Sequence, residues 1–220
     1  MTEPGTEGGR PLKRAWTWLG LGLLLVFAVW WRGHTFGPTI EKRTGWALWP
    51  EMHGPSEPLD CDEAAYGYIG RRLADGAVMY RDLTENKPPG GYWLFALAVK
   101  LGGANELTIR VIPVPMILLT VLLIFWIGRR VSGPAAGLIG GFVFVLLCTD
   151  PYLHGNGANL EHAMNLFAVA SLAAMLASWK GRRGWLVVAG MLVGCSTLVK
   201  QVGAMAGPLY ALAAWYREDR

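Results

Sequence analysis

The sequence predicts an all-α membrane protein: a polytopic helical bundle of about six spans, whose long extracytoplasmic first loop carries juxtamembrane amphipathic helices. Hydrophobic residues make up 53% of its 220 residues and charged residues only 16%, which excludes an ordinary soluble domain. Apolar stretches of about 15–22 residues recur, the length signal of transmembrane helices. Tryptophans cluster at the ends of these stretches, as in interfacial aromatic belts: Trp16, Trp18, Trp30, Trp31, Trp126, Trp179, Trp185 and Trp215.

The net charge and the cysteines exclude two further classes of feature, a nucleic-acid interface and a disulfide framework. The formal net charge is +4, but the basic residues fall mainly between apolar stretches. The charge is therefore no argument for nucleic acid, and the expected partner is the lipid bilayer. Cys148 and Cys195 lie in apolar runs and Cys61 stands alone in the long loop, so the cysteines predict no disulfide framework.

The first apolar run, 15–31, is predicted to be a retained signal anchor. Lys13 and Arg14 precede it, as in a signal peptide, but it ends in Trp30-Trp31-Arg32 without a small-residue cleavage site. Residues 1–14 are then a cytoplasmic tail. The other predicted spans form a bundle over 107–216, followed by a cytoplasmic end at 217–220; they are 107–128, 133–150, 158–179, 184–199 and 202–216.

Basic residues set the orientation of these spans. With a cytoplasmic N-terminus, every basic cluster at a span end is cytoplasmic, as the positive-inside rule requires: Arg10, Lys13, Arg14; Arg129, Arg130; Lys180, Arg182, Arg183; Arg217, Arg220. The segment 32–106 is then extracytoplasmic. We expect a multi-pass protein of the bacterial plasma membrane.

The apolar segment 90–101 decides this orientation, because one more membrane crossing would move every later basic cluster to the other side. As a helix it would reach only about 18 Å, against a hydrocarbon core of about 30 Å. If it did span, the cluster at Arg129 would move outside. Length and charge therefore both place it in the interface or make it re-entrant.

Within the long loop, residues 62–76 predict an amphipathic helix. Tyr66, Ile69 and Leu73 share one face, and Gly76 is placed as a C-terminal stop. Such a helix would lie flat on the membrane or on the bundle.

The polar residues of the predicted extracytoplasmic face are the candidate site, and each has a structural alternative. Asp60, Asp62 and Glu63 suit a helix N-terminus, although three acids exceed what one cap needs. Lys87 precedes two prolines that favour a helix start.

Three further charges lie at the ends of predicted spans. Arg110 and Lys200 are candidates for snorkelling to the interface. Glu161 suits the dipole of the span that it begins. His154 and His162 flank it without partners at ligand spacing, so no metal site is predicted.

Together these residues resemble the first extracytoplasmic loop of GT-C glycosyltransferases, in the branch of protein mannosyltransferases and aminoarabinose transferases. The resemblance covers about residues 60–210 and rests on these motifs: Asp62-Glu63 opening a helix, Tyr80-Arg81-Asp82, Asn86-Lys87-Pro88-Pro89-Gly90, Asn105-Glu106 with Arg110, Gly128-Arg129-Arg130, Glu161, and Thr197-Leu198-Val199-Lys200.

The resemblance implies transfer of a hexose or pentose from a polyprenyl-phosphate-linked donor to an extracytoplasmic protein, lipid or polysaccharide. It implies that the acidic pair carries the catalytic carboxylate and that lysines contact the donor phosphate. We hypothesise that Asp62 is the general base and that Glu63 aids contact with the acceptor or with a divalent metal, although no cofactor is fixed. Lys87 would bind the phosphate, supported by Arg110 and Lys200. Further candidates are Asp60, Tyr80, Asp82 and Glu161.

The sequence departs from the family pattern in two ways, and two other functions remain as alternatives to a glycosyltransferase. Val199-Lys200-Gln201-Val202 replaces the usual Thr-Lys-Gly-Pro, which puts the role of Lys200 in question. Family members are also much longer, which suggests a truncated reading frame or a family remnant. One alternative is therefore a catalytically inactive membrane fragment that binds a partner or a lipid. The other is a transporter, which the absence of a convincing internal repeat disfavours.

Overall fold

A computed structural model describes residues 9–37, 41, 45, 59–153, 155–179 and 184–218. Apart from an isolated bridge between Met79 and Leu83, the regular structure in these ranges is helical, as predicted. The elements are α1 (Gly9–Gly33), η1 (His34–Phe36), α3 (Cys61–Ala74), α4 (Gly90–Gly102), α5 (Glu106–Val111), α6 (Pro113–Val131), α7 (Pro134–Leu147), η2 (Pro151–Leu153), α8 (Glu161–Ser178), α9 (Gly184–Val199), η3 (Gln201–Met205) and α10 (Ala206–Glu218).

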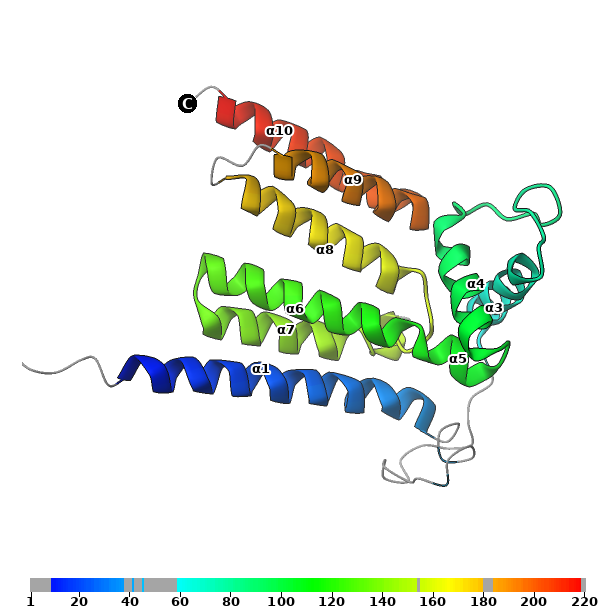
Figure 1. Cartoon of the computed structure of the whole chain (residues 1–220), viewed down its shortest axis with the longest axis horizontal. Coiled ribbons are helices and arrows are strands. Elements are labelled where there is room, and N and C mark those ends of the chain that lie inside the picture. Colours follow the sequence, from blue (N-terminus) through cyan, green and yellow to red (C-terminus); the bar gives the residue numbers. More distant parts are fainter. Residues whose placement is uncertain are drawn as a thin grey trace, which may run out of the picture.

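The six longest predicted runs form one bundle. Figure 1 shows α1 and α6 to α10 lying side by side, with α3, α4 and α5 gathered at one end. Two helical regions, 14–33 and 106–131, are long and apolar enough to cross a membrane, and the apolar helices α7 and α9 are shorter. The count of six spans and their orientation remain predictions.

Several boundaries differ from those expected. The first helix begins at Gly9, so the helix extends beyond the predicted span 15–31 into residues 9–14. The predicted span 107–128 is divided into α5 and α6, because Pro113 opens a new helix at its N-terminal position, where a missing N–H costs nothing. The predicted span 202–216 begins as the 3₁₀ helix η3. Within the predicted extracytoplasmic segment 32–106, most of residues 38–58 lie outside the described residues.

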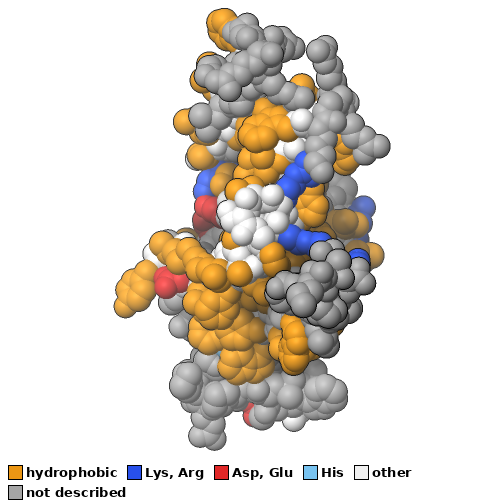
Figure 2. Space-filling model, turned by 90° about the vertical axis from the view of Figure 1, so that its left-hand side faces the viewer, with side chains coloured by type: hydrophobic (Ala, Val, Ile, Leu, Met, Phe, Trp, Pro, Cys, Tyr) orange, Lys and Arg blue, Asp and Glu red, His pale blue; other side chains and the backbone are white. Residues whose placement is uncertain are grey.

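The end of the bundle opposite α3 to α5 carries basic side chains. Figure 2 views this end and shows Lys and Arg side chains among hydrophobic ones. Arg14, near the start of α1, and Arg129 and Arg130, at the end of α6, are exposed. Two of the basic clusters that the sequence assigns to one side of the membrane therefore share an end.

The predicted amphipathic helix is α3, and it lies on the bundle end rather than alone. Tyr66 and Ile69 are buried, as the periodicity indicated. A Cβ on Gly70 would come within 2.7 Å of the Phe95 side chain of α4, so only a glycine allows this approach. Tyr66 packs edge-on against Tyr92 and Phe95, with ring centroids 5.8 and 5.6 Å away.

The short apolar segment is α4, and two glycines hold its N-terminus against the bundle. A Cβ on Gly90 would lie 2.7 Å from the carbonyl oxygen of Leu198, near the end of α9. A Cβ on Gly91 would lie 2.5 Å from the side chain of Leu160, directly before α8. The residues after Lys87-Pro88-Pro89 therefore touch the segments that lead into Glu161 and Lys200.

We expect Gly90→Ala to destabilise the protein by about 1–3 kcal/mol, because the added methyl group meets backbone atoms that cannot rotate away. Thermal unfolding in detergent measures the change. The matched control is Gly190→Ala in α9, where a Cβ meets nothing within 4 Å; a helix interior there favours alanine by up to about 1 kcal/mol. An equal change in unfolding temperature for the two variants would contradict the close approach of α4 to the bundle.

Candidate active site

The N-terminus of α3 divides its three acids between two tasks. Asp60 is the N-cap: its Oδ1 accepts hydrogen bonds from the backbone N–H groups of Asp62 at 2.6 Å and Glu63 at 3.0 Å. Glu63 completes a capping box, with Oε2 accepting from the N–H of Asp60 at 3.2 Å. Asp60 and Glu63 therefore have structural partners, whereas the carboxylate of Asp62 points elsewhere.

Asp62 meets Lys87 through a tyrosine. The Tyr66 hydroxyl donates to Asp62 Oδ2 at 2.9 Å and accepts from Lys87 Nζ at 2.6 Å. Lys87 Nζ lies 3.7 Å from Asp62 Oδ1 and 4.7 Å from the centroid of the Tyr66 ring. The Asp62 side chain keeps 52% of its surface exposed, against 22% for Lys87. A solvent-accessible carboxylate thus sits beside a largely enclosed ammonium group.

Tyr66 stays protonated in this setting. Burial, the hydrogen bond to Asp62 and the negative charges of Asp62 and Glu161 all raise its pKa well above the ordinary value. Its hydroxyl can therefore donate to the Asp62 carboxylate throughout the physiological pH range. Sequence reasoning assigned Tyr66 only to the apolar face of the helix; its spacing of four residues from Asp62 was the available signal of a contact.

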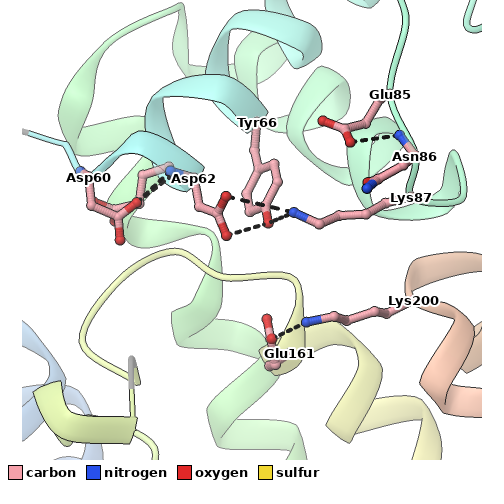
Figure 3. A network of polar contacts seen from close by, with 9 residues as sticks. Asp60, Asp62, Tyr66, Glu85, Asn86, Lys87, Glu161 and Lys200 are labelled. Carbon is pink, nitrogen blue, oxygen red and sulfur yellow. Dashed lines mark hydrogen bonds and ion pairs between the residues drawn. The ribbon is translucent and has the colours of Figure 1, made fainter.

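A second lysine–carboxylate pair lies opposite the first. Lys200, after α9, donates from Nζ to Oε1 of Glu161, the first residue of α8, with side chains 28% and 45% exposed. Figure 3 shows Lys87 and Lys200 extending in the same direction, one above the other, each ending at a carboxylate. The structure thus brings together four of the predicted residues from four separate segments.

The loop before α4 is held in place around Lys87. The Tyr80 hydroxyl donates to the backbone carbonyl of Lys87 at 2.9 Å, and Gln201 Nε2 donates to that of Asn86 at 2.8 Å. Tyr80 adopts a positive φ of 66°, a conformation uncommon for residues other than glycine. Tyr80 thus binds the backbone of Lys87 and Gln201 that of the preceding Asn86. Gln201 was not among the predicted site residues.

Asp82 and Arg110 have other surroundings. Asp82 accepts from the N–H of Val78 at 2.8 Å and pairs with Arg81, whose hydrogen bonds are the main reason that the pKa of Asp82 falls to about 2. The contact with Val78 closes the turn over residues 78–82. Arg110 is buried on α5 and forms an ion pair with Glu106, Nη1 to Oε1 at 3.1 Å. It is therefore not a snorkelling residue.

In the described ranges, no three His, Cys, Asp or Glu side chains group closely enough to hold a metal ion. The carboxylate of Glu63, which the sequence left open for metal contact, is buried against backbone N–H groups.

Comparison with known proteins adds the family. The family model described as dolichyl-phosphate-mannose-protein mannosyltransferase matches residues 86–219, which include Lys87, Glu161 and Lys200 but not Asp62. No solved structure matches.

Curated relatives bear the name undecaprenyl phosphate-alpha-4-amino-4-deoxy-L-arabinose arabinosyl transferase. That of Erwinia tasmaniensis is 30% identical over 165 residues, 70% of this chain and 30% of the relative. That of Edwardsiella ictaluri is 28% identical over 172 residues, 72% of this chain and 31% of the relative. The chain thus spans less than a third of the length of these relatives. Since the family model covers more than half of the chain, the chain belongs to the dolichyl-phosphate-mannose-protein mannosyltransferase family.

Proposed function

We propose that the protein is a membrane glycosyltransferase of the GT-C type, moving a sugar from a polyprenyl-phosphate-linked donor to an extracytoplasmic acceptor. The observation that carries this proposal is the exposed Asp62 carboxylate, 3.7 Å from the Lys87 ammonium. The family supports glycosyl transfer, and the names of the relatives support an undecaprenyl-phosphate donor carrying a pentose. The acceptor is a hydroxyl of a protein, lipid or polysaccharide.

The chemistry needs a base and a cation side by side. A bond forms between the acceptor oxygen and the anomeric carbon, while the bond from that carbon to the phosphate oxygen breaks. Asp62 takes the proton of the acceptor hydroxyl, and the polyprenyl phosphate leaves with the bonding electrons. Lys87 stabilises the negative charge that develops on the leaving phosphate.

The contacts of Lys87 are compatible with these roles. Its ammonium group lies against the Tyr66 hydroxyl and the Asp62 carboxylate. A bound phosphate competes for the ammonium group, while Tyr66 keeps its hydrogen bond to Asp62 and so holds the base in place. Lys200, paired with Glu161 on the facing segment, offers a second cation for the same phosphate.

Asp62→Asn is expected to lower the transfer rate roughly 100-fold or more, because the amide cannot accept the hydroxyl proton. The measurement is transfer of labelled sugar from a polyprenyl-phosphate donor in membranes that contain the protein. Asp75→Asn, at the other end of α3 with its side chain 67% exposed, is the matched control and should retain the wild-type rate. Wild-type transfer by Asp62→Asn would refute its role as the base.

Lys87→Glu should raise KM for the donor more than KM for the acceptor, because it places a negative charge where the phosphate binds. Steady-state kinetics with each substrate varied in turn separates the two effects. Lys100→Glu makes the same charge change at an exposed position of α4 and serves as the control. A selective loss of acceptor affinity in Lys87→Glu would assign the lysine to the other substrate.

Tyr66→Phe should lower kcat roughly tenfold, because the ring remains packed while the hydrogen bonds to Asp62 and Lys87 are lost. Since the raised pKa keeps this hydroxyl protonated, the wild-type rate should not fall through tyrosine ionisation as the pH rises from 7 to about 9. The control is Tyr68→Phe, an exposed position on the same helix. Unchanged kcat in Tyr66→Phe would exclude a role for the hydroxyl.

A further inference from the structure

A buried arginine at the end of α1 binds the backbone that leads into α8. Arg32 is 1% exposed, and its guanidinium donates to the carbonyl of Gly155 at 2.6 Å and to that of Gly157 at 2.9 Å. These carbonyls are more than 120 residues away in the sequence. The ring of His162 also donates to the Gly157 carbonyl, from Nε2 at 3.1 Å. Two side chains from two helices thus hold one short stretch of backbone.

Glu63 holds the same stretch from the other side. Its carboxylate is 4% exposed and accepts the N–H of Ala158 at 2.7 Å with Oε1, while Oε2 accepts from Asp60. A Cβ on Gly157 would come within 3.5 Å of both this carboxylate and that of Asp60, so the backbone lies directly against the N-terminus of α3. The charge of Glu63 also acts on Arg32. Burying either charge without the other would be costly.

The segment held in this way, residues 155–160, leads directly into Glu161, the first residue of α8. Leu160 is buried against Gly91 of α4, and Glu161 then pairs with Lys200. The residue before Glu63 is Asp62, which faces the site. The N-terminus of α3 therefore presents one acid to the substrate side and the next to the backbone that supports the opposite wall.

We propose that Arg32 and Glu63 are positioning residues, which clamp residues 155–160 and so hold the Glu161–Lys200 pair opposite the Asp62–Lys87 pair. This assignment rests on the proposed transferase function and replaces the expected contact of Glu63 with acceptor or metal. Both oxygens of Glu63 are bound to backbone N–H groups inside the protein, so it does not touch the substrate. Arg32 acts through carbonyls that only a forked donor can reach together.

The test compares Glu63→Gln, Arg32→Gln and the double variant with wild type, using hydrogen–deuterium exchange and transfer kinetics. Glutamine keeps the size of glutamate but turns one acceptor into a donor and removes the charge. Arg71→Gln and Asp75→Asn, which remove an exposed ion pair of the same helix, are the matched controls. Arg32→Lys is included as a variant that keeps the positive charge but cannot present the two separate N–H donors of the guanidinium group.

Each single variant should exchange amides over 155–161 about tenfold faster or more, and lower kcat 10- to 100-fold, with KM for the donor changed less than threefold. The double variant should be no worse than the more impaired single one, because both residues act on one segment. Arg32→Lys should have an amide exchange rate over 155–161 and a kcat between those of wild type and Arg32→Gln. The control variants should have the exchange rate and the kcat of wild type.

Two results would overturn the clamp. One is unchanged exchange over 155–161 together with a raised KM, which would make Glu63 a substrate contact. The other is faster exchange with unchanged kcat, or effects that simply add in the double variant. If wild type transfers no sugar from any polyprenyl-phosphate donor, the proposed function fails, whereas the exchange pattern still decides whether Arg32 and Glu63 hold the segment.

Discussion

The arrangement of the site depends on how closely the first turn of α4 approaches the bundle. Gly90 leaves no room for a side chain against the carbonyl of Leu198, and Gly91 leaves none against Leu160. This contact fixes the distance between the loop that carries Lys87 and the two segments that carry Lys200 and Glu161. It brings the two lysine–carboxylate pairs together, and the contacts of Arg32 and Glu63 with residues 155–160 support the segment that carries Glu161. The glycine that ends the Lys-Pro-Pro-Gly motif is thus required for packing at the first turn of α4.

A second constraint is electrostatic. Both lysines of the site rest against carboxylates, and both pairs are only partly buried. Exposed ion pairs of this kind contribute little to stability, so their placement is better explained by what they offer a ligand. An anionic phosphate can take over the ammonium groups without leaving buried charges uncompensated. The buried side chains of Arg32 and Glu63 instead bind backbone groups and hold the segment before Glu161 in place.

Sequence reasoning predicted the elements better than the contacts. The helical class, the amphipathic face of α3 and the full extent of α9 follow from periodicity and length, which are local properties. The N-cap was assigned less well: three acids in four residues could not reveal which one caps, and Asp60 does so. The break at Pro113 was missed because hydropathy averages over a proline at a helix start.

The roles of the site residues are set by contacts between distant segments. Glu63 binds Ala158, 95 residues away, and no local pattern distinguishes it from its neighbour Asp62. Arg110 looked like Lys200, a lone cation near a span end, yet it pairs with Glu106, which lies one helical turn earlier on α5. Family resemblance supplied the pairing of an acid with the Lys-Pro-Pro motif. The geometry adds Tyr66, which joins the two.

The central claim is that Lys87, beside Asp62, receives the phosphate of a polyprenyl donor. A structure of the protein with polyprenyl phosphate bound tests it most directly. The account predicts a phosphate oxygen within hydrogen-bond distance of Lys87 Nζ, on the same side as Lys200, with Asp62 still held by Tyr66. A phosphate bound elsewhere on the bundle, with Lys87 still engaged by Tyr66 and Asp62, would contradict it.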